Sequence, residues 1–557
     1  MILAHPSHAP FTLSLLVWLP LGLALLAALL PERLTGRALA LASLLPLAVA
    51  ITFVANFNSG YPFPQFVTNH VWIASLGIHY ALAMNGLNVS LVLLTTVLFT
   101  VSLAWSALRD LERPRLYYFW LGLAESAVLG AFLAQDLILF VAFFDLMLIP
   151  FYFLVGSWGS GDRVRATIKM VIYTAVGSFL MLAAAVATGV IAASDHHTAL
   201  SFGFGVLERL PVSRTVGDWL FLAFALAFLV KMPIAPFHGW LADAYKSMPI
   251  PAVAVFSGVV AKVASYGFLA IVLPLFPQAS HHFQVLMLII ALVSILWATA
   301  MAFTTPDARL VIAYSSVAQM GFILLGIFSL KAPGDQGALL QMLNHGLVTA
   351  AAFFIVAAVA ARSGGSERLE DMGGVAFRAP VLATLFLIVT FANLAMPGSS
   401  NFIGEFMILL GTFQSHLVIA LIASVGVVGA AFYALRLFIG AMHNRLGRPV
   451  RSYEVRRSEA IAIVPLCAII LALAFYPQFG LNRSQSSVAL AIAPAAAGQY
   501  PGPLLAAGLI AKPRRIYTYP ADTFAALYSP SGWYAYAPLG AVTYLPGKPS
   551  AHSGSRQ

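Results

Sequence analysis

The chain has 557 residues, of which 61% are hydrophobic and only 9% are charged, and its mean hydropathy is +0.89. A soluble globular chain has roughly 25% charged residues, so this composition predicts a polytopic membrane protein. The formal net charge is +10, but the cations fall in short segments between apolar stretches, which argues against nucleic-acid binding. The single cysteine, Cys467, excludes disulfides and thiolate metal sites.

Apolar stretches near the roughly 20 residues that span a bilayer follow one another along most of the chain. We therefore expect an all-α fold with about 14 transmembrane helices. The first stretch has no Lys or Arg before it, so it lacks the basic segment of a secretory signal and we expect it to be retained. The expected spans are 11–31, 36–56, 81–107, 115–134, 136–156, 167–193, 217–237, 251–275, 284–303, 309–330, 337–361, 379–412 (interrupted), 417–440 and 459–478.

The distribution of Lys and Arg predicts the orientation of these spans. If the N-terminus faces outward, nineteen cations lie in loops that face inward. The loops that face outward carry only Arg209, Arg214 and Lys331. This asymmetry follows the positive-inside rule, and fourteen spans then place both termini outside.

The spans divide the chain into five parts. Residues 1–114 form three N-terminal helices, 115–280 a first five-helix unit of spans four to eight, and 281–441 a second unit of spans nine to thirteen. Residues 442–480 hold the last helix, and 481–557 form a tail outside the membrane. The tail lacks helical periodicity, and we expect it to be loosely structured, with a docking segment for a neighbouring subunit as the alternative.

Two of the spans are broken by helix-disrupting residues. In the seventh span, Pro233 and Pro236 follow an apolar run, and in the twelfth span Pro397 and Gly398 do the same. Each broken span is the fourth of its five-span unit, and an odd number of spans makes the second unit enter the membrane from the opposite side. This pattern predicts an inverted repeat with sites at the breaks. Two proline kinks at matching positions by chance are the alternative.

Lys231 stands at the first break, within an otherwise apolar span, and its natural candidate partner is Asp145 in the middle of the fifth span. A charge kept at membrane depth is a functional-site hypothesis. Coupling between this acid and this base makes the proton affinity of each depend on their separation, which is what a proton switch needs. A static buried salt bridge is the alternative.

Other ionisable residues also lie within spans. Lys262 lies among small residues in span eight, and Glu405 follows the second break. His345 in span eleven could relay protons between them, although a packing role is equally consistent with the sequence. Glu125 lies in the middle of span four. A smaller group of polar residues fits boundary or structural roles: His238 as a capping or water-contacting residue, and Asp136 and Asp307 at helix starts.

Several ordered stretches are similar to the antiporter-like membrane subunits of respiratory complex I. They are Glu125 in span four, Phe143-Phe-Asp-Leu-Met-Leu-Ile-Pro150, Lys169-Met-Val-Ile-Tyr-Thr174, Lys231-Met-Pro-Ile-Ala-Pro-Phe-His-Gly-Trp-Leu-Ala-Asp243, Ser257-Gly-Val-Val-Ala-Lys262, Asp307 to Phe322, Asn344-His345-Gly346 and Pro397 to Leu410. The resemblance covers roughly residues 10–478. The glutamate at position 405 resembles the M type, whereas L and N subunits and cation/proton antiporter subunits usually have lysine there.

The resemblance implies a proton-translocating subunit of NADH-quinone oxidoreductase in the bacterial inner membrane. Because the sequence has no metal-ligand spacing, phosphate-binding loop or haem-type histidine pair, we expect no redox centre, cofactor or metal in this chain. Flavin, iron–sulfur clusters and quinone are then expected on partner subunits, with L-type and N-type subunits as neighbours. The family's proton path carries over to Asp145 and Lys231 as the responsive pair, to Lys262 at the centre and to Glu405 as the terminal site. A cation/proton antiporter subunit and a scaffold with vestigial charges are the alternatives.

Three positions depart from the family pattern. The acid in span five is usually glutamate, and Asp145 is one methylene shorter, so its reach to Lys231 is reduced. Gln319 replaces a histidine in span ten and cannot relay protons by titration. Tyr245-Lys246 stands where the family often has a histidine after Asp243.

Overall fold

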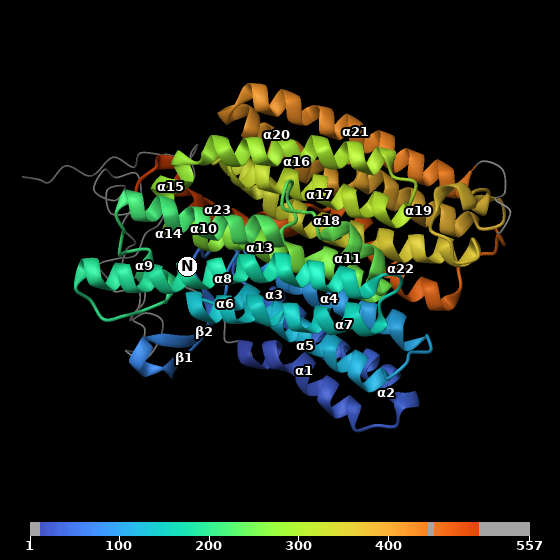
Figure 1. The fold of residues 1–557 in the computed structure, drawn as a ribbon, viewed down its shortest axis with the longest axis horizontal. Helices are drawn as coiled ribbons and strands as arrows, with labels where there is room; N and C mark the ends of the chain where they lie inside the picture. Colours follow the sequence, from blue (N-terminus) through green and yellow to red (C-terminus); the bar gives the residue numbers. More distant parts are fainter. Residues whose placement is uncertain (1–11, 444–449, 501–557) are drawn as a thin grey trace, which may run out of the picture.

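The computed structural model describes residues 12–443 and 450–500. Its helices run side by side along one direction, and they form a bundle with short connections at both ends (Figure 1). Eleven helices in the described ranges are long and apolar enough to cross a membrane. The expected helical membrane fold is confirmed.

The N-terminal part contains four helices and a β-hairpin. Its elements are α1 (Leu13–Ala28), α2 (Glu32–Ala42), α3 (Leu44–Asn56), β1 (Gln65–Ile73), β2 (Ile78–Met84) and α4 (Val89–Ala107). The strands pair antiparallel, with Gln65 opposite Met84 and His70 opposite Tyr80. The expected span at 81–107 was therefore too long at its start, because residues 81–84 belong to β2 and the transmembrane helix begins at Val89.

The first five-span unit consists of helices that are interrupted at several points. Its elements are α5 (Pro114–Leu133), α6 (Leu137–Leu146), α7 (Leu148–Trp158), α8 (Arg163–His196), α9 (Phe204–Leu207), α10 (Arg214–Lys231), α11 (Leu241–Ser247), α12 (Ile250–Val255), α13 (Ala261–Gly267), α14 (Leu273–Leu275) and α15 (Pro277–His282). Two π-helical turns, Phe256–Val260 and Phe268–Val272, join α12, α13 and α14 into one span. The fifth span changes helix at Met147, two residues after Asp145, an interruption that was not predicted from the sequence.

The second unit and the C-terminal helices follow. They are α16 (Gln284–Thr304), α17 (Ala308–Ile327), α18 (Ala332–Arg362), α19 (Pro380–Asn393), α20 (Ser400–Ser415), α21 (Leu417–Met442), α22 (Arg457–Phe475) and α23 (Gln478–Ala497). Both predicted breaks are present, between α10 and α11 and between α19 and α20. The count of fourteen spans and the inverted relation of the two units stay predictions.

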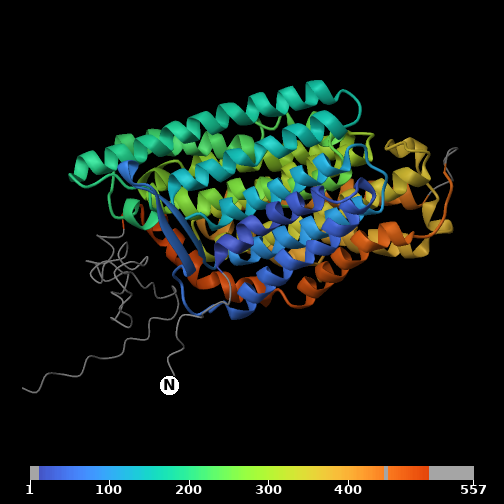
Figure 2. The ribbon, with the colours of Figure 1, turned by 90° about the horizontal axis from the view of Figure 1, so that it is seen from below.

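The prediction of a loosely structured tail was wrong for residues 481–497, which belong to α23. This helix packs on α18 and α15, and the hydroxyl of Ser487 accepts from the Gly86 amide at 3.0 Å and donates to the Pro62 carbonyl at 3.0 Å. Tertiary contacts therefore stabilise a helix whose sequence has weak periodicity. The hairpin and α23 lie at the same end of the bundle (Figures 1 and 2). Residues 501–557 lie outside the described ranges.

The two aspartates that were predicted to begin helices do so. Asp136 accepts from the amides of Ile138 and Leu139 at 3.0 and 3.1 Å and caps α6. Asp307 accepts from the amides of Arg309 and Leu310 at 3.0 and 3.1 Å and caps α17. An N-cap carboxylate satisfies amides that have no partner within the helix, so these structural assignments are confirmed.

Candidate functional site

The first break ends α10 at a buried cation. Lys231 is the last residue of α10, and Pro233 and Pro236 prevent the helix from continuing. Neighbouring side chains bind the backbone groups that the break releases: Trp240 Nε1 donates to the Val230 carbonyl at 3.1 Å. The break is therefore a defined backbone geometry inside the bundle, of the kind tolerated at membrane depth only where protein surrounds it.

Lys231 does not form an ion pair with Asp145 in this structure. Its Nζ, in a side chain only 2% exposed, donates to the carbonyl of Phe144 at 3.3 Å and lies 4.4 Å from the centroid of the Phe144 ring. Asp145 Oδ1 has no hydrogen-bond partner among the described residues. The two charges are close enough to interact electrostatically, but the ammonium contacts the residue next to the acid. The short aspartate side chain thus leaves the predicted ion pair unformed, and Asp145 is half-buried.

Lys262 lies on α13 and is fully buried. Its Nζ donates to the carbonyl of Ser257, five residues earlier and within the first π-helical turn. A π-helical turn displaces one carbonyl from the regular ladder, which gives the lysine a local acceptor. The sequence motif around Lys262 therefore produces a lysine held by the backbone of its own helix, without an acidic partner among the described residues.

His345 faces Lys262 from α18, because two glycines bring the helices together. A Cβ on Gly346 would lie 2.7 Å from the Gly258 carbonyl, so the backbones of α18 and the turn before Lys262 are in direct contact. Both ring nitrogens of His345 are buried without a hydrogen-bond partner in the described ranges, and the ring interacts electrostatically with Lys262. The structure thus places Lys262 and His345 close enough to interact electrostatically, and the relay stays a prediction.

Glu405 lies on α20, just after the second break, and two glutamines contact it. Gln319 Nε2 on α17 donates to Glu405 Oε1 at 2.7 Å. Gln341 Nε2 on α18 donates to Gln319 Oε1 at 2.7 Å and to Glu405 Oε1 at 3.3 Å. All three side chains are buried. Gln341 was not among the site residues predicted from the sequence. Its sequence signal is its position one helical turn before His345, on the same face of an apolar helix.

The second break is held by the same helix that carries His345. Gly398 adopts φ +91°, a left-handed conformation that favours glycine, and α20 resumes at Ser400. Asn344 Nδ2 donates to the Ser400 carbonyl at 2.6 Å. The break at Pro397 thus sits against α18, one residue from the histidine.

Glu125 lies apart from the buried ionisable residues described above. It is buried in α5, and its Oε1 has no hydrogen-bond partner among the described residues. Helix α5 packs mainly on α1, α4 and α6. The structure therefore brings together Lys231 with Asp145, and Lys262 with His345, but gives Glu125 no polar contact with either group.

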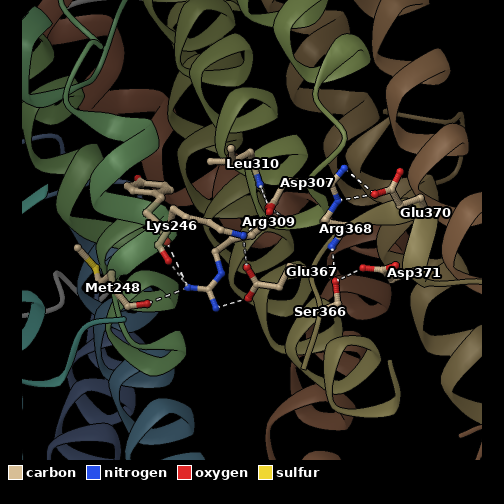
Figure 3. Close-up of polar contacts among 11 residues, drawn as sticks. Lys246, Met248, Asp307, Arg309, Leu310, Ser366, Glu367, Arg368, Glu370 and Asp371 are labelled. Atoms are coloured by element: carbon tan, nitrogen blue, oxygen red, sulfur yellow. Dashed lines mark hydrogen bonds and ion pairs between the residues drawn. The ribbon is translucent and has the colours of Figure 1, made fainter. Parts of the chain in front are cut away.

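A charge cluster that the sequence analysis did not anticipate anchors α11, the helix after the first break (Figure 3). Arg309 donates to the carbonyls of Lys246 and Met248 at 3.0 Å each, and its Nη2 lies 2.5 Å from Glu367 Oε1. Lys246 Nζ pairs with Glu367 Oε2 at 2.7 Å and with Asp307. Arg309 and Asp307 belong to the second unit, so the break in the first unit is tied directly to α17.

Comparison with known proteins places this arrangement in a family. The profile of the family described as NADH:quinone oxidoreductase/Mrp antiporter, transmembrane, matches residues 134–432. NADH-quinone oxidoreductase subunit M of Rhodobacter capsulatus is 36% identical over 495 residues, which cover 86% of this chain and 95% of that protein. The subunit M of Mycobacterium tuberculosis (strain ATCC 25618 / H37Rv) is 37% identical over 505 residues, covering 84% and 91%.

Solved structures agree with the sequence relatives. A chain of respiratory complex I from Thermus thermophilus with bound NADH superposes with a TM-score of 0.77 at 27% identity, covering 86% of this chain and 100% of that one. The Mrp complex from Dietzia sp. DQ12-45-1b gives a TM-score of 0.74 at 21% identity, covering 87% and 98%, which is a likeness of fold. The chain therefore belongs to the NADH:quinone oxidoreductase/Mrp antiporter membrane family, among the subunit M proteins of NADH-quinone oxidoreductase.

Proposed function

We propose that this chain is the proton-translocating subunit M of a bacterial NADH-quinone oxidoreductase. It couples quinone reduction elsewhere in the complex to proton movement across the membrane and carries no redox centre. Flavin, iron–sulfur clusters and quinone belong to partner subunits, and the adjacent subunits in the inner membrane are the antiporter-like L and N. Both termini face the periplasm, in keeping with the distribution of Lys and Arg.

The observation that carries this function is a row of buried ionisable groups on helices that contact one another. Lys231 ends α10, Lys262 lies on α13, His345 on α18 and Glu405 on α20. Burying an ionisable group within a membrane is costly, and such groups mark ion paths. Their placement beside two helix breaks matches the way transporters build sites near the midplane.

Lys231 and Asp145, which form no ion pair in this structure, supply the switch that controls the proton affinity of Lys231. In this structure the Lys231 ammonium contacts the Phe144 carbonyl, and Asp145 is half-buried. A neighbouring subunit that changes the charge or position of Asp145 alters the electrostatic stabilisation of the Lys231 ammonium. The lysine then holds its proton or releases it toward Lys262, which makes the row respond to events outside this chain.

The alternative is a cation/proton antiporter subunit, and the fold likeness to the Dietzia Mrp complex is the observation that favours it. Glu405 argues for subunit M, since the antiporter subunits usually place lysine at that position. Pumping that requires sodium or potassium would support the antiporter, whereas pumping that depends on NADH oxidation alone supports subunit M.

Lys262→Met tests the proposed function. The complex that contains this chain is purified in mild detergent and reconstituted into liposomes, and protons moved per NADH oxidised are measured with an enclosed pH dye. We expect the variant to assemble and to move fewer protons per NADH, because the central group of the row cannot titrate.

The matched control is Lys331→Met, the same substitution at an exposed lysine before α18. This control should leave the proton ratio unchanged. An unchanged ratio in Lys262→Met, with assembly intact, would remove Lys262 from the proton path. Partner chains that co-purify and bind flavin or iron–sulfur clusters support the oxidoreductase, and antiporter subunits as the co-purifying chains contradict it.

A further inference from the structure

The carboxylate of Glu405 is bound on one side only. Its Oε1 accepts hydrogen bonds from Gln319 Nε2 at 2.7 Å and from Gln341 Nε2 at 3.3 Å. Its Oε2 is buried without a hydrogen-bond partner among the described residues. The two oxygens of the same carboxylate therefore have different surroundings, which a symmetric solvent shell would not produce.

The two amides determine each other's orientation. Gln341 Nε2 donates to Gln319 Oε1 at 2.7 Å, so the carbonyl side of the Gln319 amide points to α18 and its NH₂ group points to Glu405. If the Gln319 amide were reversed, its NH₂ group would face the NH₂ group of Gln341 and its oxygen would face the carboxylate. Two donors would then face each other, as would two acceptors, and neither hydrogen bond could form. Gln341 thus acts on Glu405 chiefly through Gln319, which makes it a positioning residue.

A close helix contact places Gln341 in this arrangement. Gly404 precedes the glutamate, and a Cβ added there would lie 2.4 Å from Gln341 Oε1 and 3.3 Å from the Gln341 Cα. Only glycine at position 404 allows α20 to approach α18 this closely. The backbone of the two helices, and not only the flexible side chains, therefore supports the contact between the glutamines and Glu405.

We propose that Gln341 and Gln319 form an amide clamp on Glu405 Oε1 and that the transferred proton is taken up and released at Oε2. This inference rests on the proposed role of Glu405 in proton translocation. Protonation at Oε2 leaves Oε1 as a carbonyl oxygen that still accepts both amide hydrogen bonds. The clamp therefore keeps its hydrogen bonds in both protonation states, and the carboxyl group stays in one orientation while the proton enters and leaves.

The alternative is that the glutamines only join three helices. In that case the proton need not enter at Oε2. With the proton on Oε1, the carbonyl oxygen would be Oε2, which accepts from neither amide, so loss of the glutamines would affect stability without changing the hydrogen bonds of that carbonyl. Other titratable groups near Glu405 are the buried Tyr433 on α21, which interacts with it electrostatically, and His345, one turn from Gln341 on α18. Neither has a hydrogen bond to Glu405 in the described part of the chain.

Infrared difference spectroscopy on the intact purified complex tests the clamp. The C=O stretch of protonated Glu405 is assigned by labelling glutamate with ¹³C and by its loss in Glu405→Gln. With the proton on Oε2, the stretching carbonyl is Oε1, which accepts two hydrogen bonds. We expect the band to move to higher wavenumber in Gln319→Met and in Gln341→Met, since each variant removes an amide donor. Gln414→Met, at an exposed position on the same helix as Glu405, should leave it in place.

Each outcome decides the question. A band that does not move in Gln341→Met, whether or not it moves in Gln319→Met, overturns the positioning role of Gln341. A band that moves in neither variant overturns the clamp. If Gln341→Met does not assemble, Gly404→Ala replaces it, because the added methyl group displaces the Gln341 amide and must give the same upward shift.

Proton pumping provides a second readout. Gln341→Met should lose pumping while NADH oxidation with quinone reduction continues, and Gln414→Met should retain both. A loss of pumping without the band shift would assign Gln341 a different role and contradict the clamp. Normal pumping in Glu405→Gln would contradict the proposed function of Glu405, and the band shift would still decide the clamp separately.

Discussion

Replacing Lys231 with methionine separates a functional charge from a structural one. The side chain is 2% exposed and makes two recognisable contacts, the hydrogen bond to the Phe144 carbonyl and the cation–π contact with the Phe144 ring. A desolvated cation–π contact contributes about 2 kcal/mol. A hydrogen bond that involves a charged group contributes about 1.5–3 kcal/mol. Their loss would destabilise the fold by roughly 4 kcal/mol if nothing opposed it.

The opposing term is the desolvation of the ammonium. Burying an ion costs several kcal/mol, and it is offset only when a close counter-ion and further hydrogen bonds surround the charge. Asp145 makes no ion pair with Lys231 in this structure, so the offset is incomplete. Methionine is similar in length and fills the same volume without that cost. We therefore expect Lys231→Met to change the free energy of unfolding by no more than about 2 kcal/mol in either direction.

The assay compares assembly and pumping in the same preparation. Native gels and thermal melts of the purified complex measure assembly, and reconstituted liposomes measure protons moved per NADH oxidised. We expect normal assembly with a reduced proton ratio, and an unchanged ratio in the exposed control Lys331→Met. Failure to assemble would refute the energetic argument, and normal pumping in the assembled variant would refute the role of Lys231 as a switch.

Three further predictions follow from individual contacts. Asp145→Glu should reduce proton pumping only slightly, because the longer side chain can close the gap to the lysine at the end of α10. Asp145→Asn should abolish the switch, and proton pumping in liposomes distinguishes the two variants. Burial raises the pKa of Glu208, in the loop after α9, to about 7 from 4.5, opposed by the neighbouring arginine. The folded state therefore binds this proton more tightly than the unfolded state and loses stability as the pH rises from 4.5 to 7. Glu208→Gln should raise the melting temperature above pH 7 and have little effect below pH 4.5, and equal effects at both would contradict this. Arg362 donates to both oxygens of Glu459 at 2.9 and 2.8 Å, so Arg362→Met should destabilise by about 3–5 kcal/mol by leaving a buried carboxylate unpaired. A melt of the Arg362→Met/Glu459→Gln double variant, which should recover part of the loss, checks the cause.

The sequence by itself determined the membrane fold and the positions of the two breaks. Long apolar runs have one stable solution in a bilayer, the helix, because every backbone polar group must be bonded internally. A proline followed closely by a second helix-disrupting residue ends such a helix, so Pro233 with Pro236 and Pro397 with Gly398 predicted the breaks. A single proline does not suffice, since Pro20 lies inside α1 and Pro465 inside α22. The charged residues within spans could also be recognised from the sequence. They are Lys231, Lys262 and Glu405, and each carries the free-energy cost of burying a charge within an apolar span.

Only the tertiary structure decided which of these groups meet. Three features depend on how helices that are distant in the sequence rotate and approach one another. They are the hydrogen bonds of Gln341, the absence of an ion pair between Lys231 and Asp145, and the hydrogen bonds from Arg309 to the end of α11. Close contacts such as that of Gly346 with the Gly258 carbonyl set this geometry, and they arise from packing between surfaces and not from any local propensity. Helix α23 formed for a similar reason, since its neighbours stabilise a segment whose own sequence signal is weak.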